Sequence, residues 1–325
     1  MSGRPPAPPL HLAFLGTGAA ARLHSRTLSR LSERVLRSYA SRDAARAEAL
    51  RRQHGGCRSY GSYAAALSDP EVDAVLVVTP PASHLELTLE ALRAGKHVIV
   101  EKPAFLRASD VDLVRERAAA AGGQVMVAEN YFYKPLAKRL REVVRAGLVG
   151  DVLFVHVNAL KRQDVGGWRE DPAHAGGGAL YEGGIHWVNL MANLGLTVRA
   201  VRAHRAGGSA ALEKSVLVTF DYDGGAVGTL LYSWEAPSLF RGLRLSRLFG
   251  TRGSVTFESN GLFLLVHGPR RRYCLPGLRD IAGYQAMFAD FLQALRRGEE
   301  PQMTLAHAER DLALVEQAYR AGGQP

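Results

Sequence analysis

The chain has 325 residues, which is long for one hydrophobic core and favours two domains. Apolar residues make up 47% and charged residues 22%, as in ordinary globular proteins, and no apolar run reaches the roughly 20 residues of a membrane-spanning helix. The net charge of +10 does not indicate nucleic-acid binding, because the arginines are scattered among alanines and form no basic stripe. We therefore expect a cytoplasmic protein without nucleic-acid or membrane partners.

Residues 1–10 are rich in proline and are expected to be a disordered lead-in. They have no apolar stretch before a small-residue cleavage site, so we do not interpret them as a secretory signal. The chain holds two cysteines, Cys57 and Cys274, which lie far apart in the sequence. This spacing argues against a disulfide framework and against a structural zinc site.

Residues 11–130 alternate between short buried strands and helices. The expected strands are 12–15, 35–40, 74–78, 96–100 and 124–128, and the expected helices are 20–31, 43–53, 83–94 and 109–121. Ser83 and Glu86 have the spacing of a capping box at the start of the third helix. Successive units of strand and helix predict a parallel, doubly wound sheet in an N-terminal Rossmann domain.

The pattern changes near Tyr131, and residues 131–325 are expected to form a second α/β domain. A helix over 135–146 precedes strands expected over 152–159, 215–222, 226–234, 243–249, 254–258 and 262–266. Turn signals such as Asp223-Gly224-Gly225 separate several strands, which favours a mostly antiparallel sheet. Two helices, 281–297 and 304–320, close the chain.

A glycine turn, Gly16-Thr17-Gly18-Ala19-Ala20-Ala21, joins the first strand to the first helix. Gly16 permits a tight turn, Gly18 lets the backbone approach a pyrophosphate, and Ala21 allows close packing of helix on strand. The helix N-terminus adds free N–H groups and partial positive charge. An ordinary turn with small residues is the alternative, but this position between strand and helix predicts a dinucleotide site.

The end of the second strand bears on the choice of cofactor. Enzymes that use NAD usually carry an acidic side chain there, which accepts from the ribose 2′-hydroxyl. Here Ser41 takes that position, and Arg42 can bind a 2′-phosphate through charge-assisted hydrogen bonds. The alternative is that Arg42 is solvated and Asp43 caps the next helix. The sequence favours NADP, with NAD possible.

Glu101-Lys102-Pro103 follows the apolar run 98–100 at the end of a predicted parallel strand. A residue at the end of such a strand lies beside the crevice where a nicotinamide binds, so the ammonium of Lys102 is expected there. There it can stabilise negative charge on a substrate oxygen, whereas the alternative is an ordinary surface lysine. Glu101 can hold the side chain of Lys102 in position, or it can position the nicotinamide ribose.

The segment Gly176-Gly177-Gly178 to His186 is a second group of chemically active residues. A helix from Ala179 places Glu182 and His186 four residues apart on one face. A histidine oriented by a carboxylate is suited to proton exchange with a substrate hydroxyl. The pair could instead stabilise the helix or bind a metal, and without a third ligand motif we predict no metal.

Taken together these motifs resemble the Gfo/Idh/MocA family (glucose–fructose oxidoreductase, inositol dehydrogenase and rhizopine catabolism). The resemblance rests on GTGAAA, TPPASH, EKP, GLVGDV, GGGALYEGGIH and AERDLALVEQAYRAG, which span nearly the whole chain. It implies a Rossmann domain and a C-terminal domain with a large open sheet that often mediates oligomerisation. We therefore expect a homodimer or homotetramer through this sheet. Family members mostly oxidise or reduce sugars, cyclitols and related hydroxy compounds.

The resemblance also implies roles for individual residues. Lys102 matches the catalytic lysine and His186 the catalytic histidine, while Glu182 stands where the family commonly has aspartate. The implied cofactor-binding residues are Gly16, Gly18, Ala19, Ala20, Ser41, Arg42, Thr79, Pro80, His84, Glu101 and Lys102. The candidates for substrate binding are Tyr131, Lys161, Trp168 and Tyr284, of which Trp168 and Tyr284 could equally be core or interface aromatics.

These observations predict an NADP-preferring oxidoreductase that moves hydride between nicotinamide and a secondary alcohol or ketone carbon of a sugar, cyclitol or related small molecule. Two alternatives stay open. One is a catalytically silent sensor of NADP, against which the intact Lys102 and His186 count. The other is a reductase of a non-sugar substrate such as a dihydrodiol or tetrapyrrole.

Overall fold

The computed structural model describes residues 8–31, 33–207, 212–237, 243–269 and 271–322. The chain divides into two compact units. The N-terminal unit comprises residues 8–105, 109–128 and 287–305, and the C-terminal unit comprises 106–108, 129–286 and 306–322. The sequence did not indicate that residues 287–305 return to the N-terminal unit.

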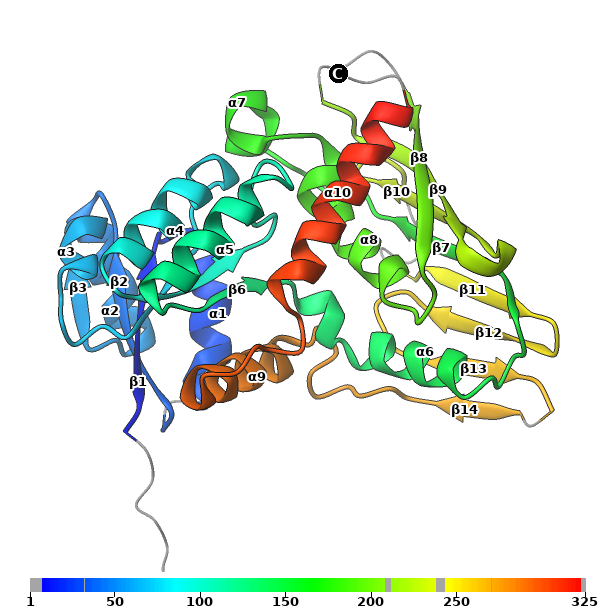
Figure 1. Ribbon diagram of the computed structural model, residues 1–325, viewed down its shortest axis with the longest axis horizontal. Helices are drawn as coiled ribbons and strands as arrows, with labels where there is room; N and C mark the ends of the chain where they lie inside the picture. Colours follow the sequence, from blue (N-terminus) through cyan, green and yellow to red (C-terminus); the bar gives the residue numbers. More distant parts are fainter. Residues whose placement is uncertain (1–7, 32, 208–211, 238–242, 270, 323–325) are drawn as a thin grey trace, which may run out of the picture. The chain divides into compact units, whose positions relative to one another are not determined.

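The N-terminal unit holds a six-stranded parallel sheet in the order β3-β2-β1-β4-β5-β6 (Figure 1). Its strands are β1 (Leu10–Leu15), β2 (Val35–Ala40), β3 (Arg58–Tyr60), β4 (Ala74–Val77), β5 (His97–Glu101) and β6 (Val125–Ala128). Its helices are α1 (Ala19–Leu28), α2 (Ala44–His54), α3 (Tyr63–Leu67), α4 (His84–Arg93), α5 (Asp110–Ala121) and most of α9 (Tyr284–Arg297). The predicted Rossmann fold is confirmed, and β3 and α3 are additions that the sequence analysis missed.

The central strands of this sheet are apolar and enclosed on both faces. All four residues of β4 are buried, as are the last five of β1, which explains their continuous apolar sequence.

The capping box predicted at Ser83 is wrong. Its hydroxyl donates to Thr79 Oγ1 and to the carbonyl oxygen of Pro80, because Ser83 lies inside the short turn Pro81–Ser83 and α4 begins at His84.

The C-terminal unit holds an eight-stranded sheet in the order β14-β13-β12-β11-β7-β10-β9-β8. Its strands are β7 (Val152–Leu160), β8 (Val198–Ala206), β9 (Ser215–Tyr222), β10 (Val227–Ser233), β11 (Leu245–Gly250), β12 (Gly253–Glu258), β13 (Leu264–His267) and β14 (Arg272–Cys274), and its helices are α6 (Pro135–Arg145), α7 (Pro172–Ala175), α8 (Ile185–Ala192) and α10 (Leu305–Ala321). Neighbouring strands are antiparallel except β7 and β10, which pair in parallel. The mostly antiparallel prediction is confirmed, although β8 and β14 were missed.

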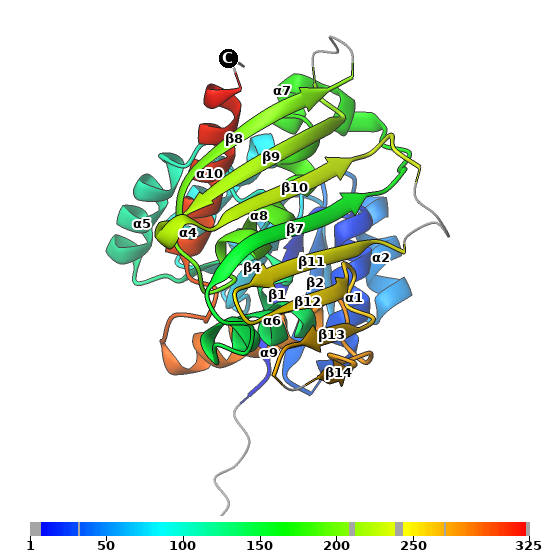
Figure 2. The ribbon, with the colours of Figure 1, turned by 90° about the vertical axis from the view of Figure 1, so that its right-hand side faces the viewer.

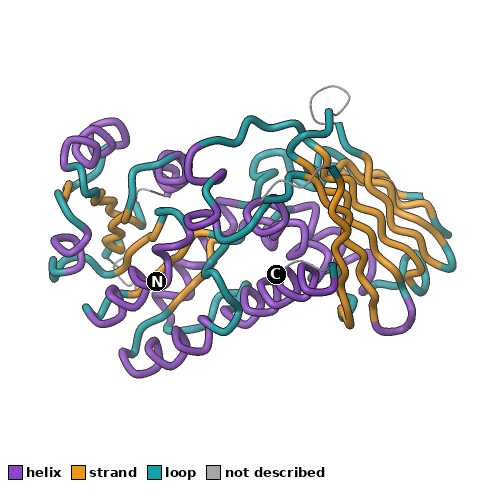
Figure 3. The backbone as a smooth tube through the Cα atoms, turned by 90° about the horizontal axis from the view of Figure 1, so that it is seen from above, coloured by secondary structure: helices purple, strands orange, loops and turns teal. Residues whose placement is uncertain are grey.

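In the described part of the C-terminal unit, the helices cover one face of this sheet and leave the other face without a helix (Figure 2 and Figure 3). Figure 2 shows the strands in front with α6, α8 and α10 behind them, and Figure 3 shows helices along one side of the sheet. Apolar side chains nevertheless lie on the other face, where Phe154 is 57% and Tyr273 is 64% exposed. None of the helices in the described part of the chain combines the length and apolar character needed to cross a membrane.

Helices α8 and α10 are joined by a buried polar contact. Asn189 Nδ2 donates to Asp311 Oδ2 at 2.6 Å, and Arg310 lies 2.8 Å from the other oxygen of the same carboxylate. Burial raises the pKa of Asp311 to about 6, although Arg310 opposes the shift. The folded state therefore holds the proton of Asp311 more tightly than the unfolded chain does.

This raised pKa predicts a pH-dependent difference in stability between the wild type and Asp311→Asn. Because the folded pKa lies above the unfolded value of 3.8, Asp311 destabilises the fold at pH 7, and this effect disappears as the pH falls through 6 towards 4. The wild type should gain roughly 3 kcal/mol relative to Asp311→Asn over that range. Urea unfolding of both proteins at several pH values measures the gain, and a constant difference would contradict it.

Candidate active site

The glycine turn lies at the carboxyl end of β1 and packs closely against neighbouring backbone. Gly16 has a φ of +120°, and a Cβ atom there would lie 2.9 Å from the carbonyl oxygen of Val78. Its N–H donates to the carbonyl oxygen of Ala40 at 3.0 Å. A Cβ atom at Gly18 would meet nothing within 4 Å, and Gly18 gives α1 no side-chain cap. This open helix N-terminus fits a bound diphosphate, which would accept from its first N–H groups.

The end of β2 carries the residues that bear on the choice between NAD and NADP. Ser41 is buried, and its Oγ accepts from the N–H of Asp43 at 3.2 Å. Asp43 caps α2 by accepting from the N–H groups of Ala45 and Arg46, as the alternative interpretation of this segment expected. Arg42 is exposed, which leaves its guanidinium accessible to a phosphate group.

Thr79, Pro80 and His84 follow β4, the strand beside β1. His84 is 1% exposed, with Nδ1 at 2.9 Å from the carbonyl oxygen of Pro103 and Nε2 at 2.8 Å from that of Thr79. Burial lowers the pKa of His84. Both ring nitrogens face backbone carbonyls, so His84 joins the loops that follow β4 and β5. The prediction that His84 itself contacts the cofactor does not fit this placement.

Glu101 is the last residue of β5 and links two parts of the N-terminal unit. One carboxylate oxygen contacts Nε2 of His24, a fully buried residue of α1, and the other accepts from the N–H of Lys102 at 2.9 Å. The Lys102–Pro103 peptide bond is cis. Because β5 and β1 point the same way in the sheet, Lys102 and the glycine turn lie at the same carboxyl edge.

His186 lies at the start of α8 and is held by a carboxylate. Its Nδ1 lies 2.7 Å and 2.9 Å from the two oxygens of Glu129, which is 2% exposed. The ring of Tyr131 stacks on the imidazole with centroids 4.5 Å apart. The carboxylate favours the tautomer with a proton on Nδ1, so Nε2 presents a lone pair. Among the described residues, Nε2 has no hydrogen-bond partner and can accept a proton from a ligand.

The carboxylate that orients His186 is therefore Glu129, and the orienting role predicted for Glu182 needs correction. Glu182 lies in a π-helical turn, Leu180–Gly184, whose wider winding changes the spacing expected of an α-helix. Its Oε1 accepts from Nε of Arg169 at 3.0 Å. The Arg169 guanidinium lies 4.5 Å above the ring of Trp168, so Glu182, Arg169 and Trp168 form one connected group.

Lys161 and Tyr284 are the remaining candidates for substrate binding. Lys161 follows β7, with an exposed side chain and a backbone N–H that donates to the carbonyl oxygen of Ser233. Tyr284 is half-buried at the start of α9. Across the described ranges, no group of three histidine, cysteine or carboxylate side chains is arranged to hold a metal ion.

Comparison with known protein families covers both units. Residues 10–129 match a family described as "Oxidoreductase family, NAD-binding Rossmann fold", and residues 137–256 match the "GFO/IDH/MocA C-terminal domain". The chain belongs to the Gfo/Idh/MocA family. It is thus an oxidoreductase with an NAD(P)-binding fold.

Relatives of this Gfo/Idh/MocA protein include enzymes with different substrates. D-xylose 1-dehydrogenase (NADP(+)) 2 of Haloferax volcanii is 31% identical, over 89% of this chain and 90% of the relative. Trans-1,2-dihydrobenzene-1,2-diol dehydrogenase of Mus musculus is 27% identical, over 97% of each chain. Among solved structures, GenD2 from gentamicin A biosynthesis in complex with NAD is 27% identical with a TM-score of 0.84, covering 98% of this chain and 95% of that chain.

Three residues of the Gfo/Idh/MocA protein are in contact with predicted site residues but were missed by the sequence analysis: Glu129, His24 and Arg169. Glu129 could have been found, because it directly follows a buried parallel strand, as Lys102 follows β5. His24 and Arg169 carry no comparable signal, since both depend on contacts between distant segments.

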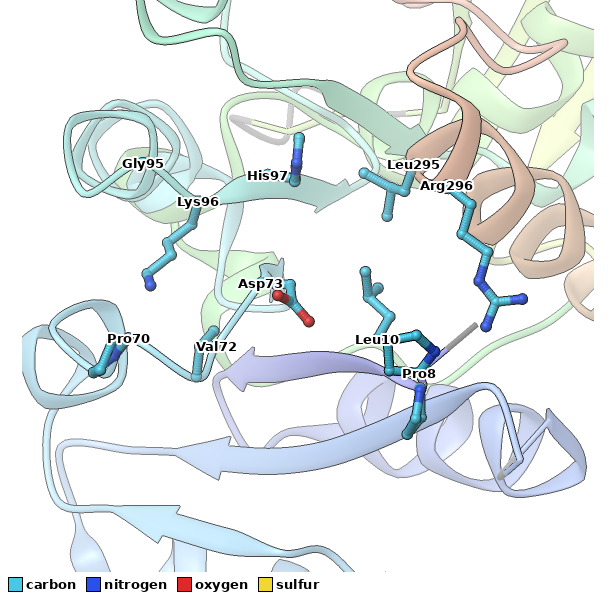
Figure 4. A pocket seen from close by; sticks show the side chains of 11 residues that line it. Pro8, Leu10, Pro70, Val72, Asp73, Gly95, Lys96, His97, Leu295 and Arg296 are labelled. Atoms are coloured by element: carbon cyan, nitrogen blue, oxygen red, sulfur yellow. The ribbon is translucent and has the colours of Figure 1, made fainter. Parts of the chain in front are cut away.

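A cavity of about 470 Å³ lies at the amino ends of the strands of the six-stranded sheet (Figure 4). Its lining includes Leu10, Asp73 and His97, at or next to the amino ends of β1, β4 and β5. Lys96 donates to the carbonyl oxygen of Asp69 at 2.8 Å, and Asp73 accepts from a backbone N–H. These polar groups are used in holding the fold, and the cavity lies at the edge opposite the glycine turn.

Proposed function

We propose that this protein is an NADP-preferring oxidoreductase that transfers hydride between nicotinamide and a secondary alcohol or ketone carbon of a small hydroxy compound. The observation that carries the proposal is the placement of Lys102 at the carboxyl edge of the sheet, where the glycine turn also lies. Parallel sheets of this kind bind their ligands at that edge. In this proposal, residues 11–130 bind the cofactor and residues 131–325 bind the substrate.

Each active residue has a role that follows from its surroundings. The nicotinamide, when bound, supplies or accepts the hydride. The Lys102 ammonium donates to the substrate oxygen and stabilises its negative charge. Nε2 of His186 takes the hydroxyl proton during oxidation and returns it during reduction, while Glu129 stabilises the imidazolium that forms. Glu182, already bonded to Arg169, is proposed to accept from another substrate hydroxyl.

A sugar, cyclitol or related polyol is the proposed substrate class. The D-xylose dehydrogenase relative supports it, since it shares 31% identity over 89% of this chain. Oxidation of a trans-dihydrodiol is the second candidate, supported by the dihydrodiol dehydrogenase relative that covers 97% of the chain. Absorbance of NAD(P)H in the presence of sugars, inositols and diols tests both. No turnover with any of them would favour a cofactor sensor without chemistry.

Arg42 is expected to set the preference for NADP. In Arg42→Ala, KM for NADP should rise about 10- to 100-fold, because a charge-assisted contact to the 2′-phosphate is lost, while KM for NAD should change little. The control is Arg52→Ala, at an exposed arginine of α2 that pairs with Glu48. An equal change in KM for both cofactors would contradict the assignment.

The uncovered face of the eight-stranded sheet is proposed to join copies of this chain. Its exposed apolar residues include Phe154, Phe249 and Tyr273, and a large exposed apolar patch usually marks an interaction surface. Phe154→Arg is expected to lower the mass measured by light scattering towards that of one chain, since the arginine would be buried without a partner. An unchanged mass would place the contact elsewhere or show that the wild type is a monomer.

A further inference from the structure

Lys134 is a buried cation in the C-terminal unit. It is 6% exposed, and its Nζ lies 4.4 Å from the centroid of the Tyr131 ring. Across the described ranges, Nζ has neither a hydrogen-bond acceptor nor a carboxylate within ion-pair distance. A buried ammonium in this state keeps three donors that a ligand could use.

Arg244 is a second buried cation beside the same aromatic residues. It is 5% exposed, and its guanidinium carbon lies 5.4 Å from the ring centroid of Trp187, which meets Tyr131 edge-on at 5.0 Å. One terminal nitrogen donates to Asn260 Oδ1, but within the described part of the chain the buried Nε meets no hydrogen-bond acceptor. A buried guanidinium N–H without an acceptor is unfavourable unless a ligand satisfies it.

Two carboxylates lie close enough to affect these cations, but both are bonded to other groups. Glu258 accepts from the backbone N–H groups of residues 260–262 and from the amide of Asn260. Glu129 is held by His186 and by the N–H of Tyr131. Burial lowers the pKa of Lys134 to about 8, and the charge of Arg244 adds to this shift, while the two carboxylates oppose it. The two acids balance charge at a distance, and no acceptor among the described residues meets Lys134 Nζ or Arg244 Nε.

We propose that Lys134 and Arg244 bind an anionic group of the substrate, a carboxylate or a phosphate, beside Tyr131 and His186. Such a group would give acceptors to Lys134 Nζ and Arg244 Nε, two donors that no described residue satisfies. Tyr131 contacts both Lys134 and His186, so a ligand bound here lies next to the proposed proton acceptor. The inference rests on the proposed function and narrows its substrate class to acidic or phosphorylated sugars and related hydroxy acids.

Calorimetric titration of the full-length protein with bound NADP tests this site with three probes: D-glucuronate, D-glucose 6-phosphate and D-glucose. The wild type should bind at least one charged sugar about tenfold or more tightly than glucose, and Lys134→Met should remove this preference while binding glucose as before. Lys138→Met is the matched control, because Lys138 is exposed one turn further along α6. The charged sugar that binds distinguishes a carboxylate from a phosphate.

Two results would overturn the inference: equal affinity of the wild type for all three probes, or an equal loss of affinity for charged and neutral sugars in Lys134→Met. If that variant does not fold, Arg244→Gln makes the same test, since glutamine can still donate to Asn260. Binding needs no hydride transfer, so Lys102→Ala should keep the preference for a charged sugar. Full turnover in Lys102→Ala would refute the proposed catalysis but would not contradict the proposed anion site.

Discussion

Replacement of Lys102 by alanine is expected to lower kcat about 10³-fold while the affinity for NADP changes little. The ammonium is proposed to bind the substrate oxygen where negative charge develops, and removal of one such donor typically lowers kcat by about 10²- to 10³-fold. The cofactor phosphates are expected to bind at the glycine turn and α1, which this change does not touch. Steady-state kinetics and titration of NADPH fluorescence measure the two quantities.

Lys138→Ala is the control for this experiment, since Lys138 is exposed on α6 and should leave both quantities unchanged. Lys102→Arg should recover part of the activity, because the positive charge is kept while its geometry changes. Wild-type turnover in Lys102→Ala would show that no ammonium is required at the substrate oxygen.

Glu129→Gln is expected to reduce kcat about 10²- to 10⁴-fold without a comparable change in KM. The Glu129 carboxylate contacts Nδ1 of His186 and favours a proton there, and it is proposed to stabilise the imidazolium that forms during proton transfer. A glutamine amide can instead donate to Nδ1, which would move the proton to Nε2 and remove the base. The pH–rate profile should change as well, which a purely structural role of Glu129 would not produce.

The conservative variant separates charge from packing at this position. Glu129→Asp keeps the negative charge and should recover part of kcat, while Glu142→Gln, at an exposed residue of α6, should have no effect. Loss of activity in Glu129→Gln together with a collapse of the thermal midpoint would assign Glu129 to stability and contradict the proton-transfer role.

The fold of the N-terminal unit was largely predictable because its central strands are short, continuous apolar runs at regular spacing. The fully buried sequence of β4 and the glycine turn after β1 were sufficient to indicate a parallel sheet with a nucleotide site. The missed strands β3 and β14 have three residues each, and β8 carries three arginines and a histidine. Such strands depend on their neighbours in the sheet for stability, so their own sequence pattern is weak.

The candidate site was predictable where one residue follows one buried strand, as Lys102 follows β5. It was less predictable where the backbone departs from a regular helix. The π-helical turn at Leu180–Gly184 could not be read from the spacing of Glu182 and His186, so the wrong carboxylate was assigned to the histidine. The contact between Arg169 and Glu182 joins segments 13 residues apart, and the contact between His24 and Glu101 joins segments 77 apart. Neither separation matches the spacing of neighbouring residues within one helix or strand, so the sequence pattern could not predict these contacts.

The most direct test is a crystal structure of the ternary complex with NADP and a bound substrate alcohol or unreactive analogue. The account predicts Lys102 Nζ and His186 Nε2 both within hydrogen-bond distance, about 3 Å, of one substrate oxygen, with its carbon facing C4 of the nicotinamide. A complex in which the Lys102 ammonium points into solvent, away from the nicotinamide and the bound alcohol, would contradict the account.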